Sequence, residues 1–320
     1  MDIRRTGIGI VSLVALGLAL MGCGGSGGSL VTPPAILVMD YGNNRLTKIR
    51  GFSDTTFTAT FGSAGTGVGQ FSGPTAISAD ADKRLYIVDN GNHRLVRIND
   101  STGAGWTSFG SFGAGVNQLN LPTGVAVDGS GRIYITDSAN NRIVRINDMT
   151  GAGWTTFGSF GSGTNQFSNP FGIHILPNGD IVVADSGNNR IVKIDNMTGA
   201  GWTALGSLGS GTNQFNLPIG INNDLAGNIL VCDSGNDRIV RFEDMTGFGW
   251  TALNSTVANP FDGPAFIDVD SGGRYYFTCF SPSGLLYRVN GITGSGFKSF
   301  GTVGTGQAQY NQTTGIIVRL

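Results

Sequence analysis

The stretch "ADSGNNRIVKI", from Ala184 to Ile194, contains an acid, an amide and a cation at Asp185, Asn188 and Arg190. Such a group suggests either a catalytic or metal-binding cluster or a structural part of a repeat. The same pattern occurs in "MDYGNNRLTKI", "VDNGNHRLVRI", "TDSANNRIVRI" and "CDSGNDRIVRF", and successive Asp residues are 49 and then 48 residues apart. Because a catalytic site is normally present once, five copies indicate a structural role.

In each copy, we expect the Asp to end a strand and accept backbone N–H groups across the following loop. The Arg begins the next strand and is expected to pair with the Asp or with a neighbouring repeat through its planar fork of donors. One carboxylate per loop is too few for a Ca²⁺ loop. The structural residues are Asp40, Arg45, Asp89, Arg94, Asp137, Arg142, Asp185, Arg190, Asp233 and Arg238.

Each repeat contains four short apolar runs, for example "TGVAVD", "IYITD", "RIVRI" and "WTTFGSF". Runs rich in β-branched residues, 53 Gly residues and a charged fraction of only 13% favour an all-β protein with many tight turns. A four-stranded unit repeated every 40–50 residues or so is typical of a β-propeller blade. A glycine-rich loop such as "GSGTNQFSNP" leads from one blade to the next.

Counting the runs predicts six blades. The folded part begins at "AILVMD", which is a second strand without a first, and it ends at "TTGIIVRL" (Thr313–Leu320), a first strand with no second. We therefore expect the C-terminal strand to complete the N-terminal blade and close the ring, which would remove open sheet edges.

The patterns "P-x-G-[IV]-x-[VI]-D", "D-S-x-N-x-R-[IV]-x-[RK]-[IF]" and "G-x-G-x-N-Q-F" resemble NHL repeats over nearly all of residues 35–320. The resemblance implies a six-bladed β-propeller of the NHL type, with units lengthened by the inserted "DMTGAGWT" segment. The family includes protein-binding scaffolds, RNA-binding faces and related enzymes, so the fold alone does not choose a function. The formal net charge of −1 argues against a nucleic-acid partner.

Residues 1–23 resemble a bacterial lipoprotein signal peptide. Arg4 and Arg5 precede an apolar run from Ile8 to Met21 that is shorter than the roughly 20 residues a membrane span needs. The run leads to "LMGC", which resembles a lipobox and implies lipidation of Cys23; an ordinary signal peptide with a chance Cys is the alternative. Residues 24–34 read as a flexible Gly/Ser/Pro linker before the propeller at 35–320. The expected location is the bacterial cell envelope, on the periplasmic or surface side of a membrane.

Two further sets of residues recur at equivalent positions of the repeat, and we interpret both as structural. Cys232 and Cys279 occupy matching positions in successive repeats, so we expect buried free thiols rather than a disulfide. The repeated "TGxGWT" is interpreted as a column of aromatic residues that pack between blades, with a sugar- or protein-binding girdle as the alternative. Its tryptophans are Trp106, Trp154, Trp202 and Trp250.

Function is expected where the repeat fails. The third position of the innermost strand is Ser78, Ala126, His174, Asn222, Asp268 and Ile317 in successive blades. His174, Asn222 and Asp268, together with Ser78, are candidates to line a central tunnel. In lactonase-like hydrolases, which this architecture resembles, central carboxylate and amide groups bind a divalent cation. Ordinary polar lining and interior hydrogen bonding are the alternatives, and only two His residues exclude a three-His zinc site.

The sixth blade also departs from the pattern. Its "FSPSG" places Phe280, Ser281, Pro282 and Ser283 on the face that carries the inter-blade loops. We expect them near Asn90 and His93 of the second blade, as a candidate binding edge. The alternative is an atypical terminal repeat without a function.

These observations favour a monomeric binding or scaffold module, anchored to a membrane by lipid, that presents its loop face to a protein or glycan. Catalytic residues, cofactors and nucleic-acid partners are not expected, since residues 35–320 contain no G-x-S-x-G, Walker or H-E-x-x-H motif. The alternative is a metal-dependent, lactonase-like hydrolase with a divalent cation in the central tunnel.

Overall fold

The computed structural model describes residues 35–52, 57–280 and 285–319. The predicted signal peptide and linker lie outside the described residues, and so do Ser281, Pro282 and Ser283. Among the described residues, no helix is long and apolar enough to cross a membrane.

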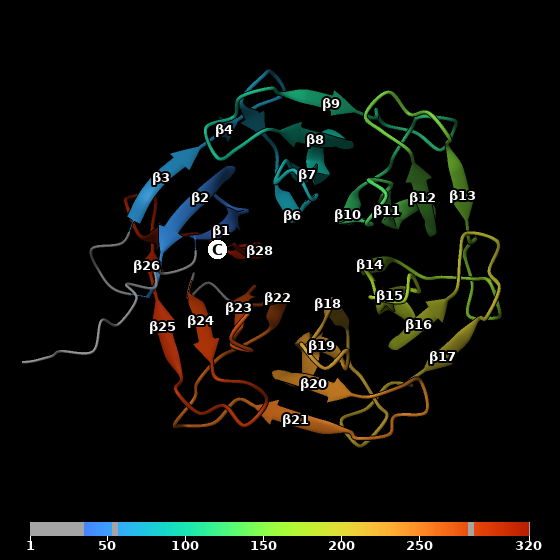
Figure 1. Ribbon diagram of the computed structural model, residues 1–320, viewed down its shortest axis with the longest axis vertical. Coiled ribbons are helices and arrows are strands. Elements are labelled where there is room, and N and C mark those ends of the chain that lie inside the picture. The colour runs from blue at the N-terminus through green and yellow to red at the C-terminus, as the bar shows by residue number, and fades with distance from the viewer. Residues whose placement is uncertain (1–34, 53–56, 281–284, 320) are drawn as a thin grey trace, which may run out of the picture. The chain divides into compact units, whose positions relative to one another are not determined.

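Six antiparallel sheets of four strands surround a central axis, each with its first strand innermost (Figure 1). The innermost strands of blades 1 to 6 are β28 (Thr313–Arg319), β6 (Pro74–Ala79), β10 (Pro122–Val127), β14 (Pro170–Ile175), β18 (Pro218–Asn223) and β22 (Pro264–Val269). The second strands are β1 (Ala35–Asp40), β7 (Leu85–Asp89), β11 (Ile133–Asp137), β15 (Ile181–Asp185), β19 (Ile229–Asp233) and β23 (Tyr275–Cys279). The predicted all-β, six-bladed propeller is confirmed.

The outer half of each blade is built from two more strands. The third strands are β2 (Arg45–Arg50), β8 (Arg94–Ile98), β12 (Arg142–Ile146), β16 (Arg190–Ile194), β20 (Arg238–Phe242) and β24 (Leu286–Val289). The outermost strands are β3 (Phe57–Phe61), β9 (Thr107–Phe109), β13 (Thr155–Phe157), β17 (Thr203–Leu205), β21 (Thr251–Asn254) and β25 (Lys298–Phe300).

The connections divide the ring into two faces. We call one the loop face, because it carries the loops between second and third strands and the long inter-blade loops. The first kind of loop contains the short 3-10 helices η1 (Asn90–Asn92), η2 (Ser138–Asn140), η3 (Ser186–Asn188) and η4 (Ser234–Asn236). Two inter-blade loops contain the parallel strand pairs β4 (Ser63–Ala64) with β5 (Gln70–Phe71), and β26 (Thr302–Val303) with β27 (Gln309–Tyr310). The opposite face, called the turn face, carries the remaining turns.

The ring is closed by strand β28. It pairs antiparallel with β1 from the other end of the chain, with Val318 opposite Ile36 and Ile316 opposite Val38. The predicted completion of the N-terminal blade by the C-terminal strand is therefore observed. The pairing supplies β1 with a neighbour on its inner side and leaves no open sheet between the first and last blades.

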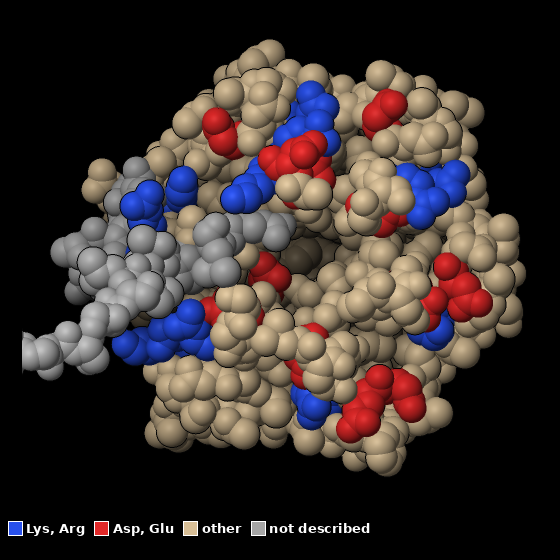
Figure 2. Space-filling model, viewed as in Figure 1, with Lys and Arg blue, Asp and Glu red and all other residues tan. Residues whose placement is uncertain are grey.

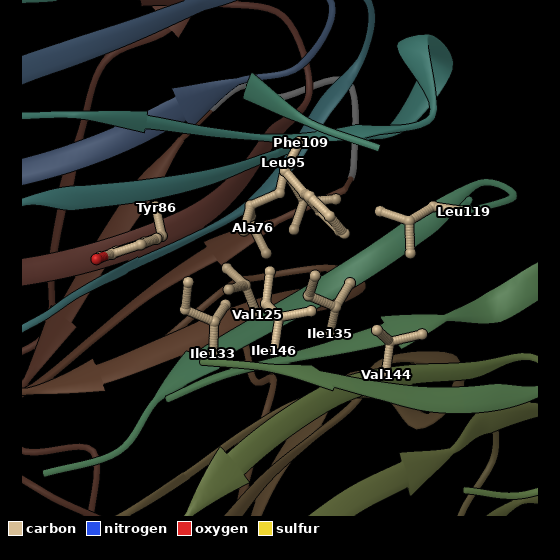
Figure 3. Packing of buried hydrophobic residues seen from close by; sticks show 11 residues of the cluster. Ala76, Tyr86, Leu95, Phe109, Leu119, Val125, Ile133, Ile135, Val144 and Ile146 are labelled. Atoms are coloured by element: carbon tan, nitrogen blue, oxygen red, sulfur yellow. The ribbon is translucent and has the colours of Figure 1, made fainter. Parts of the chain in front are cut away.

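The core consists of apolar layers between successive blades. Figure 3 shows one such layer, in which Ala76 and Leu95 of blade 2 face Val125 and Ile135 of blade 3. Strand β11 is buried along its whole length, because both faces of its sheet are covered by neighbouring blades. Each fully buried aliphatic side chain of this kind stabilises the fold by about 1.5–3 kcal/mol.

The two remaining cysteines lie in the layer between blades 5 and 6. Cys232 on β19 and Cys279 on β23 are buried free thiols, so the predicted absence of a disulfide between them is confirmed. Burial raises the pKa of both thiols, which keeps them protonated and unreactive at neutral pH.

Candidate functional site

The repeated Asp, Asn and Arg connect the loops of each blade. In blade 4, Asp185 Oδ1 accepts the Ser168 backbone N–H at 2.7 Å, while Oδ2 accepts Asn188 Nδ2 at 2.8 Å and Arg190 Nε at 2.7 Å. The backbone donor thus comes from the inter-blade loop. The sequence analysis predicted a donor from the loop between the second and third strands, which is not observed. The reason is that Gly187 and Asn189 already donate their N–H groups to the Ser168 and Ser186 carbonyls.

The Arg extends this network into the inter-blade loop. Arg190 Nη1 donates to the Ser162 carbonyl at 2.6 Å, and Nη2 donates to the Gln166 carbonyl at 2.8 Å. Burial raises the pKa of Asp185, and the hydrogen bonds from Ser168, Asn188 and Arg190 oppose that rise. Equivalent Asp contacts occur at Asp40, Asp89, Asp137 and Asp233. The structure therefore places these residues in a structural corner.

The tryptophan column lies beneath these arginines. The Arg190 guanidinium carbon is 5.6 Å from the centroid of the Trp202 ring, and the same arrangement occurs in blades 2, 3 and 5. Trp202 also contacts Phe167 of the inter-blade loop 158–169, at 5.4 Å between centroids, and Phe157 of blade 3, at 6.1 Å. The column thus packs between blades. The sequence analysis missed the Arg–Trp contact, although the shared period of the two columns was its signal.

His93 also has a repeated role that the sequence analysis missed. It has a left-handed backbone, with φ of 54°, and its Nδ1 accepts the Leu121 N–H at 3.1 Å. In blade 4, the equivalent Asn189 accepts the Leu217 N–H at 2.9 Å through Oδ1. Each such acceptor holds the residue before the proline that begins the next innermost strand. His93 therefore replaces an amide in a loop-fixing contact, while its neighbour Asn90 donates to the Pro122 carbonyl at 2.8 Å.

A cavity of about 220 Å³ lies on the axis, lined by residues of all six innermost strands. Ser78, His174, Asn222 and Asp268 all line it, so the structure brings the four candidate tunnel residues to one space. The lining extends to the last residues of β6, β10 and β14, just before the turns that follow these strands. Figure 2 shows a corresponding hollow at the centre of the ring.

Phe266 limits the cavity toward the loop face. In blades 3, 4, 5 and 1 its position is Gly, and in blade 4 a Cβ at Gly172 would lie 2.2 Å from the Ile219 carbonyl oxygen of the next blade. In blade 6 the position carries a phenylalanine whose ring reaches across the axis, since it packs against the layer between blades 2 and 3. It also contacts Phe171, at 6.1 Å between centroids. The centre of the ring is therefore partly filled by an aromatic side chain.

The polar residues of the cavity bond to one another. His174 Nε2 and Asn223 Oδ1 are 2.6 Å apart, so Nε2 carries the donated proton because an amide oxygen only accepts. Burial lowers the pKa of His174, and the bond to Asn223 opposes that change, which favours the neutral ring. Asn222 Nδ2 donates to Asp268 Oδ1 at 3.0 Å, and the Val318 N–H donates to Asp268 Oδ2 at 2.6 Å.

This arrangement does not fit a divalent cation well. Asn222 turns its NH₂ group toward Asp268, while its oxygen accepts the Asn223 N–H at 2.8 Å, so the amide does not offer an oxygen beside the carboxylate. Oxygen ligands are what a hard cation requires. Across the described part of the chain, no group of three or more His, Cys, Asp or Glu side chains is placed to hold a metal ion.

The candidate edge in blade 6 is described only at Phe280. Its N–H donates to the Gly263 carbonyl at 2.9 Å, and its ring lies 6.1 Å from that of Phe171. Phe171 and Asn90 both line a groove of about 340 Å³ on the loop face, together with Leu121 and Leu217. Phe280 therefore lies beside a residue of this groove, whereas His93 instead packs its ring against Phe112 at 4.9 Å.

The loop face is apolar and almost free of exposed charge. Five of the six inter-blade loops contain no Asp, Glu, Lys or Arg, namely 62–73, 110–121, 158–169, 206–217 and 301–312. The sixth, 255–263, contains one acid, the exposed Asp262. Phe112, Phe160 and Leu208 occupy equivalent loop positions and are 66%, 73% and 66% exposed. Of the eleven large apolar side chains exposed among the described residues, nine lie on this face and only Leu225 and Phe248 lie on the turn face. Exposed apolar surface concentrated in this way is typical of an interaction site.

Comparison with known proteins agrees with the repeat and the fold. The family model described as NHL repeat matches residues 119–146 and 167–194. No curated protein matches the chain.

Several solved structures are similar to it at low sequence identity. A nidogen/laminin complex is 18% identical, with 90% of this chain and 98% of that chain covered and a TM-score of 0.67. A catalytically inactive virginiamycin B lyase from Staphylococcus aureus, with quinupristin, is 16% identical, with 84% of each chain covered and a TM-score of 0.57. A protein of unknown function from Bacteroides caccae is 13% identical, with 90% and 99% covered and a TM-score of 0.62. At these identities the similarity concerns the fold alone. The protein is thus a six-bladed β-propeller that contains NHL repeats.

Proposed function

We propose that the protein is a binding module of the bacterial cell envelope that presents its loop face to a protein partner. The observation that carries this proposal is the concentration of exposed apolar side chains on a face where five of the six inter-blade loops have no charged residues. The centres of protein interfaces are depleted in charge and enriched in aromatic side chains, and Phe112 and Phe160 meet that description. The nidogen/laminin complex, a fold relative, adds support for a protein partner.

A protein partner is favoured over a glycan by the state of the tryptophans. Sugar-binding platforms use exposed aromatic faces, whereas Trp202 is half-buried and packs against Arg190 and Phe167. The large apolar side chains exposed on the loop face are those of Phe, Leu and Val, which offer apolar area but themselves carry no group that binds a sugar hydroxyl. A glycan at this face remains the alternative outcome of the test.

The test is photo-crosslinking of the full-length protein in its native membrane fraction. A photoreactive phenylalanine analogue at position 160 is expected to form a discrete protein adduct, and the same analogue at Ser130, exposed on the turn face of blade 3, is the control. The triple variant Phe112→Ser, Phe160→Ser and Leu208→Ser should abolish co-purification of the crosslinked protein. Equal adducts from positions 160 and 130, or retention by cell-wall polysaccharide that the triple variant does not weaken, would contradict the proposal.

The envelope location rests on a lipid anchor at Cys23 and a flexible linker over residues 24–34. The support is the Arg-flanked apolar run that leads to "LMGC" and the Gly/Ser-rich segment after it. Palmitate labelling of cells that express the wild type and Cys23→Ser tests this part. Labelling that persists undiminished in the variant would refute the anchor and leave the loop-face proposal intact.

The hydrolase alternative requires a divalent cation in the central cavity. Metal analysis of the purified propeller, repeated on Asn222→Ala and Asp268→Ala, tests it directly. Stoichiometric metal that is lost in both variants would favour the hydrolase despite the observed orientation of Asn222.

A further inference from the structure

A second surface lies on the turn face, in a cleft of about 430 Å³ between blades 4 and 5. One wall is the turn Leu176–Asp180, between β14 and β15, with Lys193 of β16. The other wall is formed by Gly227, Ile229 and the residues that follow β20, Glu243 to Met245. The cleft falls in the size range of about 300–1,000 Å³ that is usual for ligand sites. It does not share residues with the central cavity or with the groove on the loop face.

The repeat changes its charge at these two blades. In blades 2, 3 and 6 the turn between the first two strands holds an Asp–Arg pair, namely Asp80–Arg84, Asp128–Arg132 and Asp270–Arg274. In blades 4 and 5 the Arg is absent from the pattern, because Asp180 and Asn228 occupy its position. The residue after the third strand also changes, from Asn in blades 2, 3 and 6 to Asp195 and Glu243. Both blades that border the cleft have therefore lost positive charge or gained negative charge.

The cleft itself is apolar below and acidic at its rim. Leu176 and Met245 belong to the apolar layer between these blades, and Ile229 is buried beside them. The charged residues that line the cleft are three acids, Asp180, Glu243 and Asp244, and one cation, Lys193. Lys193 Nζ already bonds Asp180 at 2.7 Å and lies 3.7 Å from Asp195. Glu243 and Asp244 are exposed, so they are available to a ligand that approaches from solvent.

Figure 2 shows the consequence on the turn face. Acidic side chains gather at the lower right of the view, over the blades that carry β16 and β20 in Figure 1. The hydrogen bonds that Asp244 Oδ1 accepts from the Thr246 hydroxyl and N–H, at 2.5 and 2.8 Å, lower the pKa of Asp244 and keep it ionised. The turn of Asp244 also exposes Phe248, where blades 2, 3 and 4 carry Ala.

We infer that this cleft binds a short basic and apolar peptide segment of a partner protein. An apolar side chain of the segment enters the cleft against Leu176, Ile229 and Met245, and flanking Lys or Arg residues lie beside Glu243 and Asp244. Charge complementarity selects this occupant, because an acidic segment would meet the rim with like charge and an uncharged one would leave it unused. The site lies on the face opposite to the proposed loop-face partner, so the two are independent.

The probe is a fluorescein-labelled peptide, Arg-Lys-Leu-Phe-Lys-Arg, and the measurement is fluorescence anisotropy with the purified propeller at low salt. The double variant Glu243→Gln, Asp244→Asn should weaken binding by about fivefold, since two exposed charge contacts are lost. The matched control is Asp100→Asn, Asp148→Asn. It changes the net charge by the same amount at the equivalent turns of blades 2 and 3, where Thr102 and Thr150 make the same contacts. This control should bind like the wild type.

Two further peptides separate the contributions. Arg-Lys-Ser-Ser-Lys-Arg should bind more weakly, because it lacks the apolar pair, and Glu-Glu-Leu-Phe-Glu-Glu should not bind. The proposal is overturned if the wild type does not bind the basic peptide, or if both double variants weaken binding equally, which would indicate a general charge effect. Binding that survives in the loop-face triple variant separates this result from the outcome of the loop-face test.

Discussion

The two faces of the ring are built on different principles. On the loop face, the same buried Asp–Arg network occurs in five blades, and nine of the eleven large apolar side chains exposed among the described residues project outward. On the turn face, charged pairs lie at the surface and differ between blades, around a central hollow (Figure 2). Uniform residues therefore hold the loops in place, and the variable residues that project from loops and turns are the ones available for binding.

The physical reason is the cost of burying charge. Asp185 is fully buried, so losing the Arg leaves an uncompensated charge and losing another partner leaves an unsatisfied oxygen. A blade that carries the Asp therefore needs the complete set. Arg132 of the turn-face pair Asp128–Arg132 is 46% exposed, so water can replace its partner. The turn face is therefore free to exchange its pairs, as blades 4 and 5 do.

Removal of β28, the strand that closes the propeller, should cause the largest loss of stability. Deletion of residues 313–320 removes Ile316, Ile317 and Val318 from the layers beside β28 and opens the first blade. We expect stability to fall by about 5 kcal/mol or more, from three buried aliphatic side chains. Urea unfolding followed by tryptophan fluorescence measures it, and an unchanged unfolding midpoint would contradict ring closure by β28.

A direct comparison of the two faces pairs Asp185→Ala with Asp128→Ala. The first variant leaves the Arg190 guanidinium and the Ser168 N–H without their acceptor inside the corner, and should cost about 3–5 kcal/mol. The second removes a partly exposed pair with Arg132 and should cost about 1 kcal/mol or less. Equal losses in urea unfolding would show that the faces do not differ as described.

The pH dependence of stability should have opposite signs on the two faces. Burial raises the pKa of Asp185 above 3.8, so its contribution is full below that value and is lost as pH rises through the raised pKa. For Asp128, burial acts in the same direction but is outweighed by hydrogen bonds from the Arg132 side chain and backbone and from the Ser130 backbone, which lower the pKa below 3.8. Its contribution is present above 3.8 and is lost as pH falls through the lowered pKa.

The measurement is urea unfolding of the wild type, Asp185→Asn and Asp128→Asn between pH 3 and pH 6 or so. The stability difference from wild type should shrink with rising pH for Asp185→Asn and grow for Asp128→Asn. Slopes of the same sign would refute the contrast. Glu243→Gln, at an exposed position that is not part of either pair, serves as the reference for general charge effects.

The smallest effect concerns the one loop-face acceptor that is not Asn or Asp. His93→Asn introduces the acceptor used in blades 1, 3 and 4, so we expect a change of less than about 0.5 kcal/mol. His93→Ala leaves the Leu121 N–H without its acceptor and should cost about 1 kcal/mol. If both variants lose the same stability, the imidazole has a role beyond fixing this loop.

Much of the architecture could be predicted because it depends on local patterns repeated along the chain. The count of repeated apolar runs predicted six blades, and the unpaired runs at "AILVMD" and "TTGIIVRL" predicted the closure. The Ser168 donor to Asp185 was not foreseen, because it depends on how the loop N–H groups of Gly187 and Asn189 are already used. Such competition between donors is decided in three dimensions.

The candidate cavity shows the same division. Placing His174, Asn222 and Asp268 at equivalent positions of successive innermost strands was enough to bring them to the axis, since all innermost strands run along it. Their chemistry was not predictable, because Asn222 orients its NH₂ group toward Asp268 and His174 bonds Asn223. The Phe266 side chain beside them contacts the layer between blades 2 and 3 only because the propeller is closed.

The sequence by itself thus determined the number of blades, their strand order and the corners that hold their loops, because each of these depends on residue spacing within one repeat. Only the tertiary structure decided which of the residues that depart from the repeat lie next to one another. The cleft joins Leu176 to Met245, which are far apart in sequence, and the apolar residues of the loop face come from separate inter-blade loops. Contacts between blades depend on how the closed ring places them, which no single repeat encodes.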